Sequence, residues 1–147
     1  MLRKLLGSRS GSGDPIETAF GVLERDVLRV LWGEGDLAVR DVQARLSRPA
    51  AYTTVMTTLD RLFKKGVLRR RQDGRAFLYA AALSAPELRA SIAGRVLAGI
   101  LRSPDSEAVP VLSNLVDSVS SQDGGQELLE TLESLVREKR RELRKRT

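Results

Sequence analysis

The stretch between Ala50 and Gly66 carries the side chains whose types and spacing most clearly predict a chemistry. Val55, Leu59 and Leu62 recur at helical intervals and form one apolar stripe. The opposite side carries hydroxyl, methyl and guanidinium groups, on Thr53, Thr54, Thr57 and Arg61. These groups can meet base edges and phosphates in the major groove of DNA. The alternative is an ordinary amphipathic helix whose polar face is solvated.

A basic hairpin is predicted directly after this helix. The strands are expected at 67–71 and 76–80, joined by the turn signal Asp73-Gly74. Phe77 and Tyr79 share one strand face and are expected to cover the helices. The hairpin holds four arginines within seven positions, at Arg69, Arg70, Arg71 and Arg75. Because such like charges repel one another unless they meet phosphate, the hairpin favours contact with a nucleic-acid backbone.

The side chains on which most catalytic and metal sites depend are missing from this chain. It has no cysteine and no histidine, which excludes disulfides, thiolate nucleophiles, histidine acid–base chemistry and most zinc, copper or iron sites. The Gly/Ser-rich run at 7–14 lacks the strand-then-helix context of a phosphate-binding loop. We therefore expect a binding protein, not an enzyme, with no metal and no cofactor.

Charge is distributed unevenly along the 147 residues. Residues 50–80 hold seven Lys/Arg against two Asp/Glu, whereas residues 83–138 hold four against nine. This pattern predicts a polyanion-binding half and a half with another task. The first apolar run is too short for a signal peptide, and no stretch approaches the roughly 20 apolar residues of a membrane span. We expect a cytoplasmic protein.

The elements that must position the polar helix face are two preceding helices, at 17–33 and 38–47. With the helix at 50–66 and the hairpin they predict a mainly α winged helix-turn-helix domain with a small β-hairpin wing, at 17–82. Asp26 and its charged neighbours are expected to face outward. Residues 1–16 are expected to be a disordered arm, or else an arm that contacts phosphates or the minor groove. The expected core is Leu23, Val27, Leu31, Val55, Leu59, Leu62 and Phe77.

Three more amphipathic helices are predicted in the region 83–147. Ser84 and Glu87 form a capping box that opens the first, and the others are expected at 108–119 and 125–145. Because these helices have little globular body to bury against, their expected partner is a second copy of the chain. The alternative is that they fold back on the winged helix as one monomeric core. The expected dimer contacts are Leu88, Ile92, Leu112, Leu115, Val116, Leu128, Leu132 and Leu135.

The last ten or so residues, REKRRELRKR, are dense in cations. Cations at the C-terminal end of a helix are compatible with its dipole, so a solvated tail is the simplest interpretation. Non-specific contact with nucleic acid is the alternative.

Three runs, LERDVLRVLW, VRDVQARL and AYTTVMTTLDRLFKKGVLRRRQDGRAFLY, resemble the BlaI/MecI family of penicillinase repressors, which includes copper-responsive CopY-type members. The resemblance is close over about residues 20–80 and is one of layout beyond. It implies a winged helix followed by a helical dimerisation region. It also implies homodimer binding to two-fold symmetric DNA operators with TACA/TGTA-like half-sites. The copper-responsive branch uses C-terminal cysteines, so copper sensing is not expected here.

The resemblance also implies roles for particular residues. The groove-facing set is Tyr52, Thr53, Thr54, Met56, Thr57 and Arg61, with Lys64 and the wing arginines on the DNA backbone. In that family a membrane sensor triggers proteolysis of the repressor, and the matching bond here is Asn114–Leu115, with a leucine where an aromatic can stand. Asn114 is otherwise a polar residue on the outer face of a short helix. Two rival hypotheses stay open: release by a ligand or by sensor contact, and a winged-helix scaffold that binds proteins.

Overall fold

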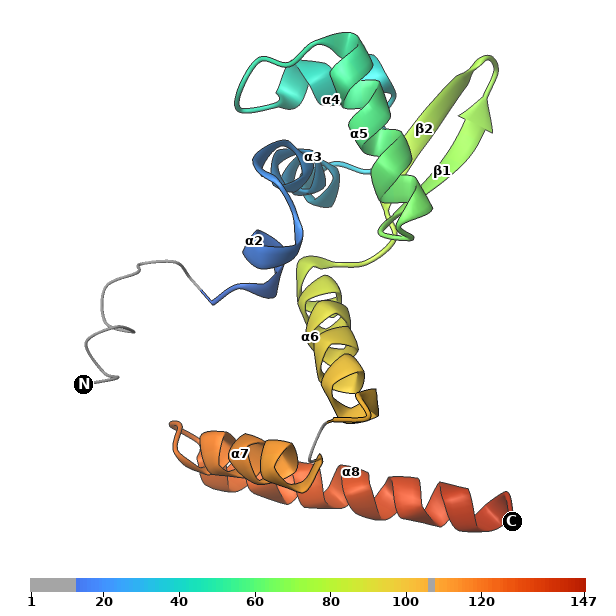
Figure 1. Ribbon diagram of the computed structural model, residues 1–147. Coiled ribbons are helices and arrows are strands. Elements are labelled where there is room, and N and C mark those ends of the chain that lie inside the picture. Colours follow the sequence, from blue (N-terminus) through green and yellow to red (C-terminus); the bar gives the residue numbers. More distant parts are fainter. Residues whose placement is uncertain (1–12, 106–107) are drawn as a thin grey trace, which may run out of the picture. The chain divides into compact units, whose positions relative to one another are not determined.

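The computed structural model describes residues 13–105 and 108–147 (Figure 1). The chain divides into a first compact unit that ends at Val96 and a second from Leu97 to Thr147. Helix α6, Ala85–Arg102, runs from one unit into the other, so its first half belongs by its contacts to the winged-helix unit. Most of the predicted N-terminal arm, residues 1–12, lies outside the described residues. Its last two residues, Pro15 and Ile16, are helical.

The first unit contains short helices and one hairpin. Its elements are α2 Pro15–Ala19, α3 Val22–Gly33, α4 Val39–Arg45, α5 Tyr52–Lys64, β1 Leu68–Asp73 and β2 Ala76–Ala81. The single helix expected at 17–33 is interrupted, because Phe20 is extended and buried while Gly21 caps α3. Asp14 caps α2 by accepting a hydrogen bond from the Ile16 N–H at 2.9 Å.

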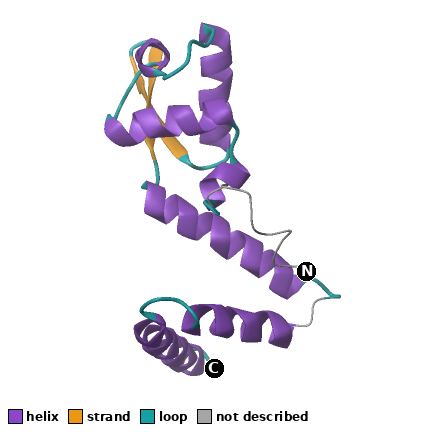
Figure 2. Cartoon of the chain, turned by 90° about the vertical axis from the view of Figure 1, so that its left-hand side faces the viewer, coloured by secondary structure: helices purple, strands orange, loops and turns teal. Residues whose placement is uncertain are grey.

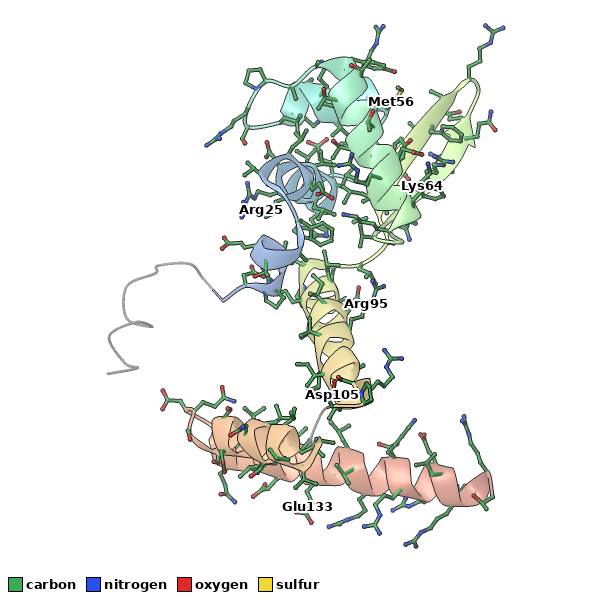
Figure 3. The ribbon with its side chains drawn as sticks, viewed as in Figure 1. Arg25, Met56, Lys64, Arg95, Asp105 and Glu133 are labelled. Atoms are coloured by element: carbon green, nitrogen blue, oxygen red, sulfur yellow. The ribbon has the colours of Figure 1, made fainter. Side chains whose placement is uncertain are left out.

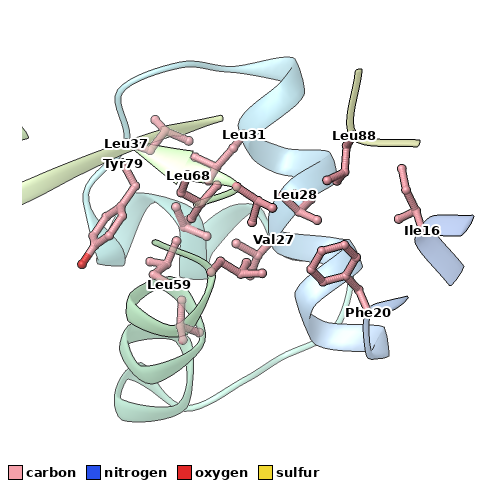
Figure 4. Packing of buried hydrophobic residues seen from close by; sticks show 14 residues of the cluster. Ile16, Phe20, Val27, Leu28, Leu31, Leu37, Leu59, Leu68, Tyr79 and Leu88 are labelled. Carbon is pink, nitrogen blue, oxygen red and sulfur yellow. The ribbon is translucent and has the colours of Figure 1, made fainter. Parts of the chain in front are cut away.

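The core of this unit lies between α3 and α5, beneath the hairpin (Figure 4). Five of the seven expected core residues are buried there: Val27, Leu31, Val55, Leu59 and Leu62. The prediction was wrong for Phe77, whose surface is 42% exposed, and Leu23 is only half-buried. The core also includes Ile16, Phe20, Leu28, Leu37, Val42, Val67, Leu68, Tyr79 and Leu88.

Asp26 was expected to face outward but is buried. Its Oδ2 accepts hydrogen bonds from the Ser47 backbone N–H at 2.9 Å and from the Ser47 hydroxyl at 2.7 Å. Arg29 Nη1 lies 3.8 Å from the other carboxylate oxygen. A buried carboxylate requires such partners. The contact ties α3 to the turn that leads from α4 into α5.

The wing is an antiparallel pair of strands, in register from Leu68 opposite Ala81 to Asp73 opposite Ala76. Gly74 at its tip has φ 62°, a conformation that favours glycine. Leu37, in the link between α3 and α4, extends the sheet: it exchanges two backbone hydrogen bonds with Tyr79, of 2.9 and 2.8 Å. This bridge holds the hairpin to the helices and completes the expected winged helix.

In the second unit, α7 Ala108–Ser120 and α8 Gly125–Lys145 lie side by side (Figures 1 and 2). The turn between them depends on two glycines. Gly124 has φ 77°, and a Cβ at Gly125 would lie 2.5 Å from the Val119 carbonyl oxygen. Many apolar side chains stay exposed, including Leu128 at 44% and Leu135 at 58%. Across the ranges 13–105 and 108–147, no helix is long and apolar enough to cross a membrane.

Replacing Gly125 by alanine should destabilise the α7–α8 pair. The added methyl group has no room beside the Val119 and Ser120 carbonyls, so the backbone must shift at a cost of about 1–3 kcal/mol. The control is Gly99→Ala in α6, where the added Cβ meets nothing within 4 Å and should raise stability by about 0.5–1 kcal/mol. Thermal unfolding followed by circular dichroism measures both, and equal shifts in the same direction would contradict the turn geometry.

Candidate nucleic-acid interface

Helix α5 presents one exposed polar face and one buried apolar face. Its buried residues are Val55, Thr58, Leu59 and Leu62. The α5 residues expected to contact DNA are all exposed: Tyr52, Thr53, Thr54, Met56, Thr57 and Arg61 toward the groove, and Lys64 toward the backbone. Met56 and Lys64 mark this face in Figure 3. The structure thus brings the predicted side chains together on one surface, and their contact with DNA remains a prediction.

The Thr57 hydroxyl is already engaged within the helix. Its O–H donates to the Thr53 carbonyl oxygen at 2.8 Å. The exposed side chain therefore offers a methyl group and an acceptor oxygen, and not a donor. In a major groove these groups match the thymine methyl and the exocyclic amino groups of cytosine and adenine. Thr58 makes the equivalent bond to Thr54, but it is buried and belongs to the core.

Asp60 connects α5 to the wing. Its carboxylate contacts Lys64 Nζ at 2.9 Å and Arg70 Nη1 at 3.2 Å. Hydrogen bonding from Lys64, with a smaller contribution from Arg70, holds the pKa of the Asp60 carboxyl below its ordinary value. The resulting stabilisation is present above the ordinary aspartate pKa and is lost as the pH falls through the lowered value. Because exposed pairs of this kind are weak, Lys64 can exchange Asp60 for a phosphate.

Arg70 is partly buried against other parts of the protein. Its guanidinium lies 4.0 Å from the ring centre of Phe63 and 4.4 Å from that of Phe77, and it also pairs with Asp60. This geometry differs from the expected free phosphate contact: Arg70 joins the wing to α5. It also explains why Phe77 is outside the core, since its ring covers Arg70. Strand alternation in the sequence could have indicated this position, because Arg70 lies opposite Tyr79, which is on the side of the hairpin that faces the helices.

The remaining wing arginines are exposed. Arg69 and Arg71 alternate with Arg70 along β1 and so lie on its other face. Arg71 Nε lies 3.7 Å from Asp36 Oδ1. Among the described residues, neither Arg69 nor Arg75 has a hydrogen-bonded or ionic partner. These side chains are available to an anionic ligand.

A surface hollow of about 500 Å³, which no sequence pattern indicated, lies beside the polar face of α5. The first turn of α3 lines one side, at Gly21 and Val22, and Arg61 with the α5 threonines lines the other. Glu24 also borders it, but its carboxylate pairs with Lys65 at 3.1 Å. The positive end of the α3 dipole therefore lies near a guanidinium, an arrangement suited to a backbone phosphate.

The expected dimer contacts divide into two groups. Leu88 is buried in the core of the first unit, and Ile92 packs half-buried against it. Leu88 therefore offers no surface to a second chain, because only 2% of its surface is exposed, contrary to the expectation. The other six lie in the second unit, where Leu132 is half-buried and Leu112, Leu115, Val116, Leu128 and Leu135 are exposed. Those six remain predictions.

The expected cleavage bond, Asn114–Leu115, lies within α7, and both residues are exposed. The Asn114 carbonyl accepts a hydrogen bond from the Ser118 hydroxyl at 2.7 Å. A protease would therefore meet this bond in helical form and would need local opening to reach it. In the part of the chain that the structure describes, no cluster of acidic residues could hold a metal ion.

Comparison with known proteins gives consistent matches. A family model described as Penicillinase repressor matches residues 20–137. The Transcriptional regulator BlaI of Mycobacterium tuberculosis is 40% identical over 92 residues, 60% of this chain and 64% of that protein. A Penicillinase repressor from Bacillus licheniformis is 34% identical over 58 residues, 38% of this chain and 45% of that protein. The chain thus spans less than two thirds of either relative.

Among solved structures, the chain is similar to the solution structure of the DNA binding domain of the repressor BlaI. The two are 29% identical, and the match covers 45% of this chain and 83% of that one with a TM-score of 0.42.

Arg70→Ala should destabilise the first unit, whereas Arg75→Ala should not. The Arg70 variant loses stacking on two rings and the Asp60 contact, together worth about 1–2 kcal/mol. Arg75 is exposed and should change stability by less than about 0.5 kcal/mol. Arg70→Lys keeps the charge but not the planar stack, so it should fall between the two. Urea unfolding measures the stability of the three variants, and equal unfolding midpoints for all of them would contradict the role assigned to Arg70.

Proposed function

The chain belongs to the penicillinase repressor family, and from this premise we propose that it represses transcription by binding duplex DNA through α5 and the wing. Members of this family are transcriptional repressors and not enzymes. One observation carries the proposal: the polar face of α5 is exposed while its apolar face is buried in the core. A helix held this way can enter a major groove without rearrangement.

The proposed interface separates base reading from backbone binding. The side chains proposed to read bases are Tyr52, Thr53, Thr54, Met56 and Thr57. Those proposed to hold phosphates are Lys64, Arg69, Arg71 and Arg75, together with Arg61, which was expected in the groove and which borders the hollow beside α3. Phosphate contacts set the position of the protein on the duplex, and contacts at base edges select the sequence. Arg70 contributes indirectly, by keeping the wing against α5.

We further propose that the repressor binds as a homodimer to a two-fold symmetric operator with TACA/TGTA-like half-sites. One winged helix fills one major groove, so two copies would occupy half-sites roughly 10 base pairs apart. The exposed leucines and valines of α7 and α8 support this proposal, because apolar surface of this extent favours association. A second copy would cover them at a symmetric interface.

Release from DNA is proposed to occur by proteolysis at Asn114–Leu115, triggered by a membrane sensor or protease upstream. A cut there separates α8 and part of α7 from the rest of the chain without touching α5. Two linked DNA-binding modules gain roughly 10²–10⁴-fold in avidity, which the cut would remove. Release by a ligand or by sensor contact is the rival for this step. A protein-binding scaffold is the rival for the whole function, and the exposed wing arginines favour DNA.

Thr57→Ala should alter base preference, whereas Arg69→Ala should not. Loss of the Thr57 methyl and oxygen should cost about 1–3 kcal/mol at the affected base pair. Loss of Arg69 should weaken binding to all sequences alike. It should also make the slope of log K against log salt concentration shallower by about one unit. Selection from a randomised duplex library at several salt concentrations measures both effects. An altered base preference in the Arg69 variant would show that the wing reads sequence, and absence of DNA binding by the parent protein would reject the function.

If proteolysis releases the repressor, mass spectrometry of protein from derepressed cells should find a fragment that ends at Asn114. The Asn114→Ala variant should stay intact and keep the promoter silent. Ser113→Ala, at the neighbouring exposed position of α7, is the control and should be cut as the parent is. Intact parent protein under full derepression would reject cleavage in favour of release by a ligand or by sensor contact.

A further inference from the structure

The C-terminal half of α8 carries a line of arginines that the proposed interface does not use. Arg137, Arg140, Arg141 and Arg144 follow at helical spacing and lie on one face of the helix, here called the arginine stripe. With Glu133 and Val136 they line one shallow surface hollow. Figure 3 shows nitrogen-tipped side chains along this half of α8, beyond the labelled Glu133.

Most of these cations lack a partner within the described ranges of the chain. Residues 137–146 hold seven Lys/Arg against two Asp/Glu, an excess nearly equal to the +6 of the entire chain. Arg137 pairs with Glu133 at 2.6 Å, and Lys139 with Glu142 at 2.8 Å. Among the described residues, no hydrogen bond or ion pair engages the side chains of Arg140, Arg141 or Arg144. These neighbouring guanidinium groups therefore repel one another.

The stripe points away from the apolar side of α8. At about 3.6 residues per turn, Leu128, Leu132 and Leu135 lie on the side of the helix roughly opposite to Arg140 and Arg144. Whatever covers those leucines, α7 or a second chain, leaves the stripe in water. Its charges are therefore not explained by the packing of the helix.

We propose that the arginine stripe binds the phosphate backbone of duplex DNA without regard to base sequence. Guanidinium groups form paired hydrogen bonds to phosphate oxygens. The backbone of duplex DNA supplies a dense line of negative charge, which relieves the repulsion along the stripe. The inference rests on the proposed function in taking DNA as the polyanion, and it adds a second DNA-binding surface to the one on α5 and the wing.

An anionic membrane is a poorer match to the same charges. A helix lying in a membrane surface buries its apolar side, and its long cationic side chains reach the headgroups from the flanks. On α8 the stripe would then face away from the lipid. The first half of the helix also carries Glu127, Glu130 and Glu133, which anionic headgroups would repel.

The test compares two double variants of the full chain that lose equal charge. Arg140→Gln/Arg144→Gln removes half of the stripe, and glutamine preserves helix propensity. Arg95→Gln/Arg102→Gln removes two exposed arginines of α6 and is the matched control. Binding is measured to a duplex of random sequence between 50 and 200 mM salt. If two phosphate contacts are lost, the stripe variant should bind the duplex more weakly than the parent at 50 mM salt. The ratio of the parent's affinity to the variant's should fall roughly tenfold between 50 and 200 mM salt. The control variant should keep the duplex affinity and the salt dependence of the parent.

Three results would overturn the inference. The stripe variant could keep the parent's affinity and salt dependence, or the control could lose as much as the stripe variant. The third is loss of binding to phosphatidylglycerol-containing vesicles with duplex binding retained, which would assign the stripe to a membrane surface. In each case the parent still binds DNA and the proposed function stands. A parent that binds neither this duplex nor any selected from the randomised library at 50 mM salt would reject both the inference and the proposed function. Circular dichroism tests whether the variants keep their helices.

Discussion

The burial of Val55, Leu59 and Leu62 of α5 against α3 is the constraint on which the rest of the structure depends. Each of the three side chains is fully enclosed. Burying side chains of this size contributes about 1.5–3 kcal/mol each, so the helix cannot turn about its axis without losing that stabilisation. The direction of its polar face is therefore set by the burial of its apolar face. The surface proposed to bind a groove is obtained because the other side of α5 is buried in the core.

Polar contacts then set the position of α5 relative to its neighbours. The Asp26–Ser47 contact holds the turn before α5, and the Arg70 stack on Phe63 and Phe77 holds the wing after it. Neither contact would reach DNA in the proposed interface. Their effect is to limit the motion of the side chains proposed to read bases relative to those proposed to bind the backbone, and specific binding requires such accurate placement.

Charge is used differently in the two units. In the first, several cations near α5 have an acidic partner, as Lys64 has Asp60 and Lys65 has Glu24. In the proposed interface such pairs would lower non-specific attraction and leave selection to base contacts. At the end of α8, cations outnumber acids, and three arginines stay unpaired in the part of the chain that is described. A surface of this kind suits binding that depends on charge density and not on sequence.

Much of the fold could be read from the sequence because its signals are local. Helical and strand periodicity located α5, the hairpin and the amphipathic helices, and hydroxyls and cations opposite the apolar stripe of α5 indicated the exposed surface. The absence of cysteine and histidine likewise excludes most metal and nucleophile chemistry without any coordinates. The inferences about helices and strands use residues within a few positions of one another.

The tertiary structure decided which side chains are free. Arg69 and Arg70 are adjacent and chemically identical, yet only Arg70 is partly buried, because β1 turns it toward Phe63. Asp26 is buried because Ser47, 21 residues away, supplies two donors, and Leu88 joins a core built from residues far earlier in the chain. Burial and pairing depend on neighbours in space, and a periodic pattern along the chain carries no record of which distant residues will become those neighbours.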